Sequence, residues 1–221
     1  YNPFFTTLMF LFIFFEFTFA QEKPNIIFIM ADDLGYGDLG AYGQVMIQTP
    51  NIDRLSSGGI QFSDFYSGAS VCAPARSVLM TGLHTGHTRI RGNFGKGGVI
   101  GLAGKEGRVP LRDEDLTIAE VLQDKGYRTG MVGKWGLGEP NTTGEPYKKG
   151  FDYFYGFYNQ RRAHSYYPEY LWENTHKVML FGNEKEQNHQ YTHSLFADKA
   201  INFIDRNHQT PFFLYLPVCI P

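Results

Sequence analysis

Cys72 and Arg76 have the side chains and the spacing of a nucleophile and a guanidinium that act together on one small anion. Pro74 suits the first turn of a helix, which predicts a helix that starts near this residue and ends at Gly82. Backbone N–H groups and the helix dipole favour anionic groups at such an N-terminus. If the helix reaches back to Cys72, Arg76 lies one turn later on the same face. A buried cysteine beside an arginine that pairs with a surface carboxylate is the alternative that these residues alone leave open.

Two adjacent carboxylates, Asp32 and Asp33, follow a predicted strand at residues 25–30. Ligands of open α/β sheets bind at the carboxyl ends of the strands. Carboxylate oxygens are the ligands that Ca²⁺ and Mg²⁺ take, so the pair is a candidate site for one hard cation. A turn or a helix cap is the other reading of the same pair.

The elements that must position these residues alternate along the chain. The run at 25–30 is continuously apolar, which is typical of a strand buried on both faces. Residues 92–110 are rich in glycine and indicate a loop. The alternation predicts an α/β fold with a mostly parallel central sheet and helices on both faces. Strands are expected at 25–30, 60–65, 127–132 and 212–216, and helices at 49–58, 74–82, 117–126 and 192–207.

Two of these helices have clear start signals. Thr49 before a proline predicts the first turn of one helix, with Ile52 and Leu55 facing inward. Thr117 and Glu120 have the spacing of a capping box, in which each side chain bonds the backbone N–H of the other.

Composition excludes several classes of protein. The chain has 221 residues, with 20 basic and 22 acidic side chains, so no excess of positive charge supports nucleic-acid binding. The 43% hydrophobic content excludes a disordered chain. Two cysteines are too few for a disulfide framework, and Cys219 is expected to be a packed thiol.

Residues 1–20 contain eight phenylalanines and a single charge and end on Ala20. This pattern predicts a secretory signal that is cleaved after Ala20, so that residues 21–221 form the mature chain. A membrane anchor is the alternative, but polar residues interrupt the run of about 20 apolar residues that spanning requires. We therefore expect export to the periplasm, the cell exterior or a lysosomal-type lumen, without stable membrane insertion.

The cysteine segment resembles the first signature of the sulfatase family, which belongs to the alkaline phosphatase superfamily. That signature is Cys-x-Pro-x-Arg, then four residues, then Thr-Gly, and every fixed position is matched here. The matching residues are Cys72, Pro74, Arg76, Thr81 and Gly82.

A second signature, Gly-Tyr-x-Thr-x-x-x-Gly-Lys, is matched from Gly126 to Lys134. The resemblance extends from about Lys23 to the end of the chain. It implies the alkaline phosphatase/sulfatase-like fold, incomplete at the C-terminus, with residues 21–221 as the N-terminal part of the catalytic domain.

The resemblance also implies a reaction. Such enzymes are sulfuric ester hydrolases, arylsulfatase-like, that cleave aryl or carbohydrate sulfate monoesters. By similarity, a formylglycine-generating maturation system would oxidise Cys72 to formylglycine, whose hydrate attacks sulfur. Asp32, Asp33 and the converted residue 72 would bind Ca²⁺, with Mg²⁺ as the alternative. The metal and Arg76 would lower the cost of ionising the nucleophile, and Lys134 would hold the sulfate oxygens.

The sequence departs from the family pattern in two places. Sulfatases commonly have a histidine two positions after the signature lysine, where this chain has Gly136. His164 is our candidate to replace it in substrate binding, and a solvated loop histidine is the alternative. The chain stops at Pro221, before the expected general-acid histidine and further metal ligands, so we expect these 221 residues alone to be inactive.

Two other functions remain open at this point. A phosphatase or phosphodiesterase of the same superfamily typically uses Thr or Ser with two zinc ions, so Cys72 argues against it. A non-catalytic homologue that binds sulfated glycans is supported by Gly136. The ten aromatics within residues 151–172 suit stacking on sugar rings, or packing under another part of the protein.

Overall fold

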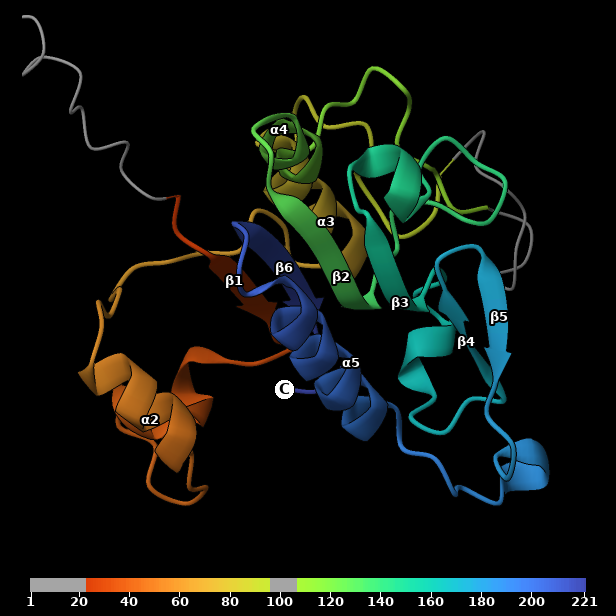
Figure 1. Ribbon diagram of the computed structural model, residues 1–221. Helices are drawn as coiled ribbons and strands as arrows, with labels where there is room; N and C mark the ends of the chain where they lie inside the picture. Colours follow the sequence, from red (N-terminus) through yellow and green to blue (C-terminus); the bar gives the residue numbers. More distant parts are fainter. Residues whose placement is uncertain (1–22, 96–106) are drawn as a thin grey trace, which may run out of the picture.

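The computed structural model describes residues 23–95 and 107–221. The predicted signal sequence and residues 96–106 of the glycine-rich loop lie outside this part of the chain. The described strands form one six-stranded sheet in the order β1-β6-β2-β3-β4-β5 (Figure 1). They are β1 (Ile26–Met30), β2 (Arg128–Lys134), β3 (Tyr153–Phe157), β4 (Tyr170–Glu173), β5 (His176–Met179) and β6 (Phe212–Pro217).

The first four strands in this order run parallel, and the last two are added antiparallel. β6 pairs with β1 on one side and β2 on the other, and β3 extends the parallel part beyond β2. β4 and β5 form an antiparallel hairpin on the edge next to β3. The predicted mostly parallel sheet is thus confirmed, and its parallel strands end at a common edge.

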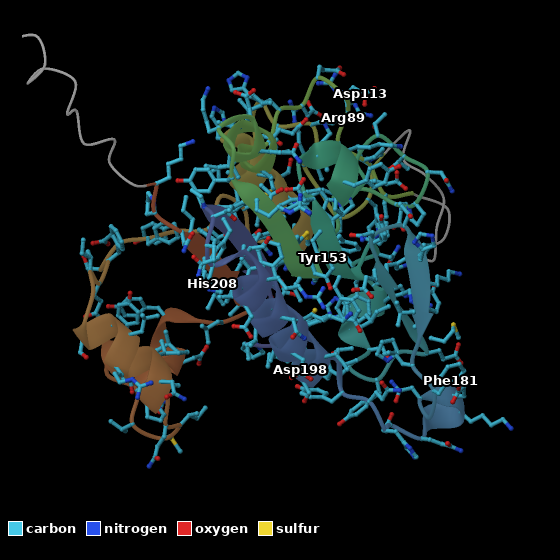
Figure 2. All side chains as sticks on the ribbon, viewed as in Figure 1. Arg89, Asp113, Tyr153, Phe181, Asp198 and His208 are labelled. Carbon is cyan, nitrogen blue, oxygen red and sulfur yellow. The ribbon has the colours of Figure 1, made fainter. Side chains whose placement is uncertain are left out.

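Helices cover both faces of the sheet, as predicted. α3 (Cys72–Thr81) and α4 (Ile118–Asp124) lie on one face, and α5 (Thr192–Asn207) lies on the other (Figure 1). Figure 2 shows how side chains fill the space between these layers. On the α3 and α4 face the buried cluster includes Met80, Ala119, Trp135 and Phe151, and on the α5 face it includes Val132, Phe196, Ala200 and Phe203.

The capping box at the start of α4 is present. The Thr117 hydroxyl accepts a bond from the Glu120 N–H at 3.2 Å, and the Glu120 carboxylate accepts one from the Thr117 N–H at 2.9 Å. The Thr117 hydroxyl also lies 2.8 Å from the Lys149 carbonyl oxygen. These bonds fix the helix that leads into β2, the strand that carries Lys134.

Three local expectations are wrong. α2 (Pro50–Ser57) begins where predicted, but its apolar residues Ile52 and Leu55 are 45% and 72% exposed. The helix stands apart from the sheet, next to the short helix η3 (Gly40–Tyr42) (Figure 1). Residues 60–65 form no strand.

The third wrong expectation concerns β1, which is an edge strand in the described part of the sheet rather than a strand buried on both faces. Its residues Ile27 and Ile29 are 47% and 59% exposed, because no described helix covers that face. Between residues 23 and 95 and between 107 and 221, no helix has the length and apolar character that crossing a bilayer requires.

Candidate active site

Cys72 is the first residue of α3, which begins two residues before the predicted start at 74 and so meets the condition that the helix reaches back to Cys72. Val71 before it is extended, and its carbonyl accepts the bond from the Ala75 N–H at 3.1 Å. The Ala73 N–H, which has no acceptor within the first turn of the helix, donates to the Asn93 side-chain oxygen at 3.0 Å. A neighbouring loop thus completes the helix cap. The Cys72 thiol is free and half-buried. The helix therefore presents this thiol at its positive end.

Arg76 lies one turn into α3 and is completely buried. Its guanidinium donates to the Lys134 carbonyl at 2.7 Å and to the Asp32 carboxylate at 3.0 Å. It also lies 3.4 Å from the Tyr215 hydroxyl. Burial by itself would lower the pKa of Arg76, but Tyr215 and Asp32 raise it, so the side chain stays charged. Arg76 thus connects the residues at the ends of β1 and β2 with Tyr215 on β6.

Asp32 and Lys134 complete a buried group of charges below the thiol. The Lys134 ammonium bonds to the second oxygen of Asp32 and lies 3.4 Å from Cys72 Sγ. Lys134 has no exposed surface, and Asp32 is 7% exposed. Burial acts to raise the pKa of Asp32, but the bond from Lys134 and the charge of Arg76 lower it below its usual range. One carboxylate therefore holds two cations, and one of these cations reaches the sulfur.

Asp33 is placed differently from its neighbour. Its side chain is exposed, and its backbone has a positive φ of 61°, which Asp tolerates better than most residues. Together the two carboxylates offer the hard oxygen donors that Ca²⁺ and Mg²⁺ take. Within the described residues, however, no three His, Cys, Asp or Glu side chains gather closely enough to hold a metal ion. The donor chemistry fits such a cation, and these residues would supply part of its ligands.

A hollow of about 270 Å³ opens beside Cys72, and we refer to it as the Cys72 hollow. Its wall includes Cys72, Asn93, Phe94, Arg108, Gln160, Arg161 and His164. His164 lies on the short helix η5 (Arg162–His164), which follows the end of β3. The structure thus brings the predicted His164 to the same hollow as Cys72, while its role in binding substrate stays a prediction.

The structure explains why position 136 is occupied by a glycine. Its φ is +78°, and a Cβ built there would lie 2.4 Å from Cγ and 2.6 Å from Cδ of Gln160. Gln160 is 2% exposed, and its amide nitrogen lies 3.4 Å from the Gly136 carbonyl. Its side-chain oxygen is buried without a partner among the described residues. The Gln160 amide therefore occupies the space that a side chain at position 136 would enter.

Arg108 is a residue of the hollow that sequence reasoning missed. It is 6% exposed, donates to the Asn93 carbonyl at 2.6 Å and stacks over the Phe94 ring at 4.4 Å. Its Nε has no partner within the described part of the chain. Burial lowers the pKa of Arg108, while Glu139 and Cys72 act in the opposite direction. The only sequence signal was a single arginine within the glycine-rich loop at 92–110, which is too weak to place it.

Cys219 is a buried free thiol, as predicted. Burial raises the pKa of its thiol to about 12, so it stays protonated. Its backbone N–H donates to His193 Nε2 at 3.0 Å, which joins the end of β6 to α5. This cysteine is therefore a packing residue.

Comparison with known proteins matches residues 24–218 to the family model named Sulfatase. Human arylsulfatase A is 46% identical over 138 residues, which are 62% of this chain and 26% of the relative. Arylsulfatase of Hemicentrotus pulcherrimus is 37% identical over 212 residues, 88% of this chain and 36% of the relative. The chain thus spans about a quarter to a third of the length of these relatives.

Solved structures agree with these matches. The structure of Ps i-CgsB in complex with k-i-k-neocarrahexaose has a TM-score of 0.73 and 32% identity, over 90% of this chain and 46% of that one. A second structure, in complex with its substrate D-glucosamine-2-N,6-O-disulfate, has a TM-score of 0.69 and 29% identity. It matches 89% of this chain and 34% of that one.

Proposed function

Because the chain belongs to the sulfatase family, we propose that it carries the nucleophile side of the active site of a sulfuric ester hydrolase that removes sulfate from sugars. The curated relatives support sulfate ester hydrolysis in general. Two structural neighbours with 32% and 29% identity hold saccharides, one of them a disulfated glucosamine. These neighbours favour a carbohydrate sulfate over a simple aryl sulfate as the substrate.

The observation that carries the proposal is the position of residue 72. It lies at the positive end of α3, 3.4 Å from the buried Lys134 ammonium and at the wall of an open hollow. A helix N-terminus and a lysine both favour negative charge on this side chain. The same groups would stabilise the charge that develops on a sulfate group in the hollow.

We propose that Cys72 is oxidised to formylglycine, which needs a maturation system as a partner. The hydrated aldehyde would supply two hydroxyls on one carbon. One would attack sulfur as the S–O bond to the sugar breaks and the sugar alcohol leaves with a proton, and the other would then expel the sulfate as the carbonyl re-forms. The chain's own residues prepare this position. Lys134 stabilises an ionised oxygen there, and Arg76 holds Asp32 and the end of β2 in place.

Asp32 and Asp33 are the residues that we propose as ligands of a Ca²⁺ or Mg²⁺ ion. Such an ion would add positive charge beside residue 72 and so assist ionisation of the nucleophile. Both carboxylates follow β1 at the carboxyl edge of the sheet, the edge where β2 ends at Lys134.

The remaining residues of the hollow bind the substrate. Arg108 brings a guanidinium, whose Nε has no partner among the described residues, to the wall of the hollow that Cys72 also lines. Gln160 and His164 offer an amide and an imidazole to the sulfate or to the sugar hydroxyls. We propose that Gln160 takes over the space and the polar contacts of the histidine that other sulfatases have two residues after the lysine.

Formylglycine formation and Ca²⁺ binding both suit an oxidising, calcium-accessible compartment outside the cytoplasm. We therefore propose that the protein is exported, with residues 1–20 as the signal. The lumen or exterior in which the protein acts depends on its organism.

The proposal is tested with the native protein purified from its own host. Sulfated monosaccharides and 4-nitrophenyl sulfate are offered separately, and free sulfate is measured by ion chromatography. We expect sulfate release that is lost in the Cys72→Ala variant. Release of phosphate from 4-nitrophenyl phosphate without release of sulfate would overturn the proposal in favour of a phosphatase. Binding of the sugars without any release would favour a non-catalytic glycan-binding protein.

A further inference from the structure

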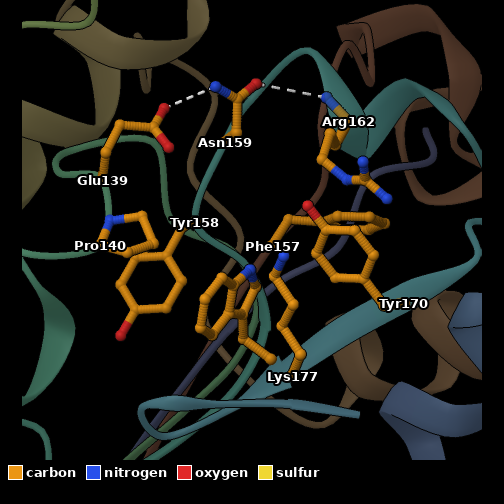
Figure 3. A pocket seen from close by; sticks show the side chains of 9 residues that line it. Glu139, Pro140, Phe157, Tyr158, Asn159, Arg162, Tyr170 and Lys177 are labelled. Atoms are coloured by element: carbon orange, nitrogen blue, oxygen red, sulfur yellow. Dashed lines mark hydrogen bonds between the residues drawn. The ribbon is translucent and has the colours of Figure 1, made fainter. Parts of the chain in front are cut away.

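A second hollow, with a volume of about 310 Å³, lies among the aromatic residues between β3 and the β4–β5 hairpin (Figure 3). We refer to it as the aromatic hollow. Neither the proposed catalysis nor the sulfate contacts use it. The residues that matter for its chemistry are Glu139, Tyr158, Arg162, Tyr170, Trp172 and Lys177.

Three rings form the walls of the aromatic hollow. The Trp172 ring meets Tyr158 edge to face at 5.2 Å between centroids and meets Tyr170 edge to face at 6.2 Å. Trp172 and Tyr170 are both half-buried, and both line the hollow. Rings at right angles form a corner that a flat apolar face can enter. Pockets of this kind suit a small ring-shaped ligand whose polar groups are fixed by a few side chains.

Two cations lie at this corner. The Arg162 guanidinium is 3.7 Å from the centroid of the Tyr170 ring, and the Lys177 ammonium is 4.5 Å from the same centroid. Neither cation has an acidic partner at ion-pair distance in the described part of the chain. Arg162 Nε is buried and has no hydrogen-bond partner there. An incoming anion would therefore find two cations that form no ion pair with the described carboxylates.

One carboxylate, that of Glu139, shares the aromatic hollow. It accepts a bond from the Asn159 amide at 2.5 Å, and Figure 3 shows it on the opposite wall from Tyr170. Burial raises the pKa of Glu139. The hollow thus has a positive side around Arg162 and Lys177 and a hydrogen-bonding side suited to hydroxyl groups.

A single loop connects the two hollows. Residues 159–164 follow β3, and Gln160, Arg161 and His164 line the Cys72 hollow. From the same loop, Asn159 and Arg162 line the aromatic hollow. Consecutive Cα atoms are only about 3.8 Å apart, so the two hollows are close neighbours. A chain of a few sugar rings would extend from one hollow to the other.

We propose that the aromatic hollow binds a second sugar ring that carries an anionic group, either sulfate or carboxylate, in the same glycan whose sulfate ester enters the Cys72 hollow. This inference rests on the proposed function and adds that the substrate is an oligosaccharide with more than one anionic group. The apolar face of the sugar packs against Trp172, since the two cations already lie over the Tyr170 ring. Its anionic group pairs with Lys177 and Arg162, and its hydroxyls face Glu139.

Tryptophan fluorescence tests this inference directly, because the chain has two tryptophans and only Trp172 lines the hollow. Trp135 has no exposed surface. The Cys72→Ala variant of the full chain is titrated with k-i-k-neocarrahexaose, with tetragalacturonate as the carboxylate probe and with neutral maltohexaose. We expect saturable quenching by at least one of the anionic probes and none by maltohexaose. Quenching that persists in the Trp172→Phe variant would show that the signal arises elsewhere and would overturn the inference.

Charge variants identify the anion contact. Lys177 is exposed, so the Lys177→Gln variant is expected to fold normally and to raise the Kd of the anionic probe about tenfold. Lys125→Gln removes an equal charge from the far end of α4 and should leave the Kd unchanged. Equal Kd values for Lys177→Gln and the unaltered chain, or equal affinity for neutral and anionic probes, would overturn the inference.

Hydrolysis of 4-nitrophenyl sulfate, which is too small to reach the aromatic hollow, separates this inference from the proposed function. In a catalytically competent protein, Lys177→Gln should leave its turnover unchanged and raise the KM for the sulfated hexasaccharide. Hydrolysis without quenching would refute the second sugar site and leave the sulfatase assignment intact. Quenching, together with no release of sulfate by the native protein from either 4-nitrophenyl sulfate or the sulfated hexasaccharide, would refute the assignment instead.

Discussion

Removal of the Asp32 charge should destabilise the fold strongly. The carboxylate is 7% exposed and is the shared partner of Arg76 and Lys134, both of which have no exposed surface. The Asp32→Asn variant keeps the size of the side chain but leaves two buried cations without a counter-charge. Breaking a buried ion pair in this way costs about 3–5 kcal/mol. For a domain of this size, the loss corresponds to a fall in Tm of roughly 6–20 °C.

Urea and thermal unfolding at pH 7, followed by circular dichroism in the presence of a chelator, measure this loss without contributions from a bound cation. Asp33→Asn is the matched control, because Asp33 has the same chemistry one residue later but is exposed. It should change the free energy of unfolding by less than about 0.5 kcal/mol. Replacing Arg76 by Met together with Asp32→Asn should recover part of the loss, since one unpaired cation is then gone. If Asp32→Asn costs no more than Asp33→Asn, the assignment of Asp32 as the counter-charge is refuted.

Three further predictions concern other parts of the structure. Gly136→Ala should lower the free energy of unfolding, measured with urea, by at least about 1–2 kcal/mol, because the positive φ disfavours Ala and the new Cβ meets Gln160. Adding Gln160→Ala to this variant should remove only the steric part of that loss. Burial lowers the pKa of His193, so the folded state binds fewer protons than the unfolded state, and stability should fall as the pH drops through about 6.5. This fall should be smaller in His193→Gln, and an identical pH profile for both proteins would contradict the assignment. Exhaustive treatment of the native protein with EDTA should abolish sulfate release, and added Ca²⁺ or Mg²⁺ should restore it. Full activity after chelation would exclude the proposed role of Asp32 and Asp33 as metal ligands.

Local sequence signals predicted the core of the candidate site well, because the relevant geometry is local. The spacing of Cys72 and Arg76 needs only one turn of helix to bring them to one face, and Pro74 and Gly82 define the two ends of that helix. Asp32 follows an apolar strand, and Lys134, which only the resemblance to the sulfatase signature singled out, is the last residue of β2. The ends of parallel strands meet at one edge, so their proximity follows from the strand assignments.

Non-local features could not be predicted in the same way. The amphipathic pattern of α2 shows that Ile52 and Leu55 share a face, but not what covers that face, and in the described chain they are exposed. Residues 60–65 have strand propensity but no partner strand, and a strand needs one for its backbone bonds. The sequence analysis predicted neither β3 nor the β4–β5 hairpin, because the aromatic block in this region has no simple alternation.

Arg108 and Gln160 reach the Cys72 hollow from loops, and loop paths depend on the packing of the whole domain. The contact between Gln160 and Gly136 joins positions 24 residues apart through the pairing of β2 with β3. The sequence alone showed that the histidine was missing and offered His164 as its replacement. The fold places Gln160 beside Gly136 and brings His164 to the wall of the same hollow.

The central claim is that Cys72 is the precursor of the nucleophile, and mass spectrometry of one peptide tests it most directly. Trypsin releases residues Leu55–Arg76 from the protein purified from its native host. Conversion of Cys72 to formylglycine makes this peptide lighter by about 18 Da than the unmodified thiol form. We predict this loss in the native protein. An intact thiol throughout, in a host that contains the maturation system, would contradict the account.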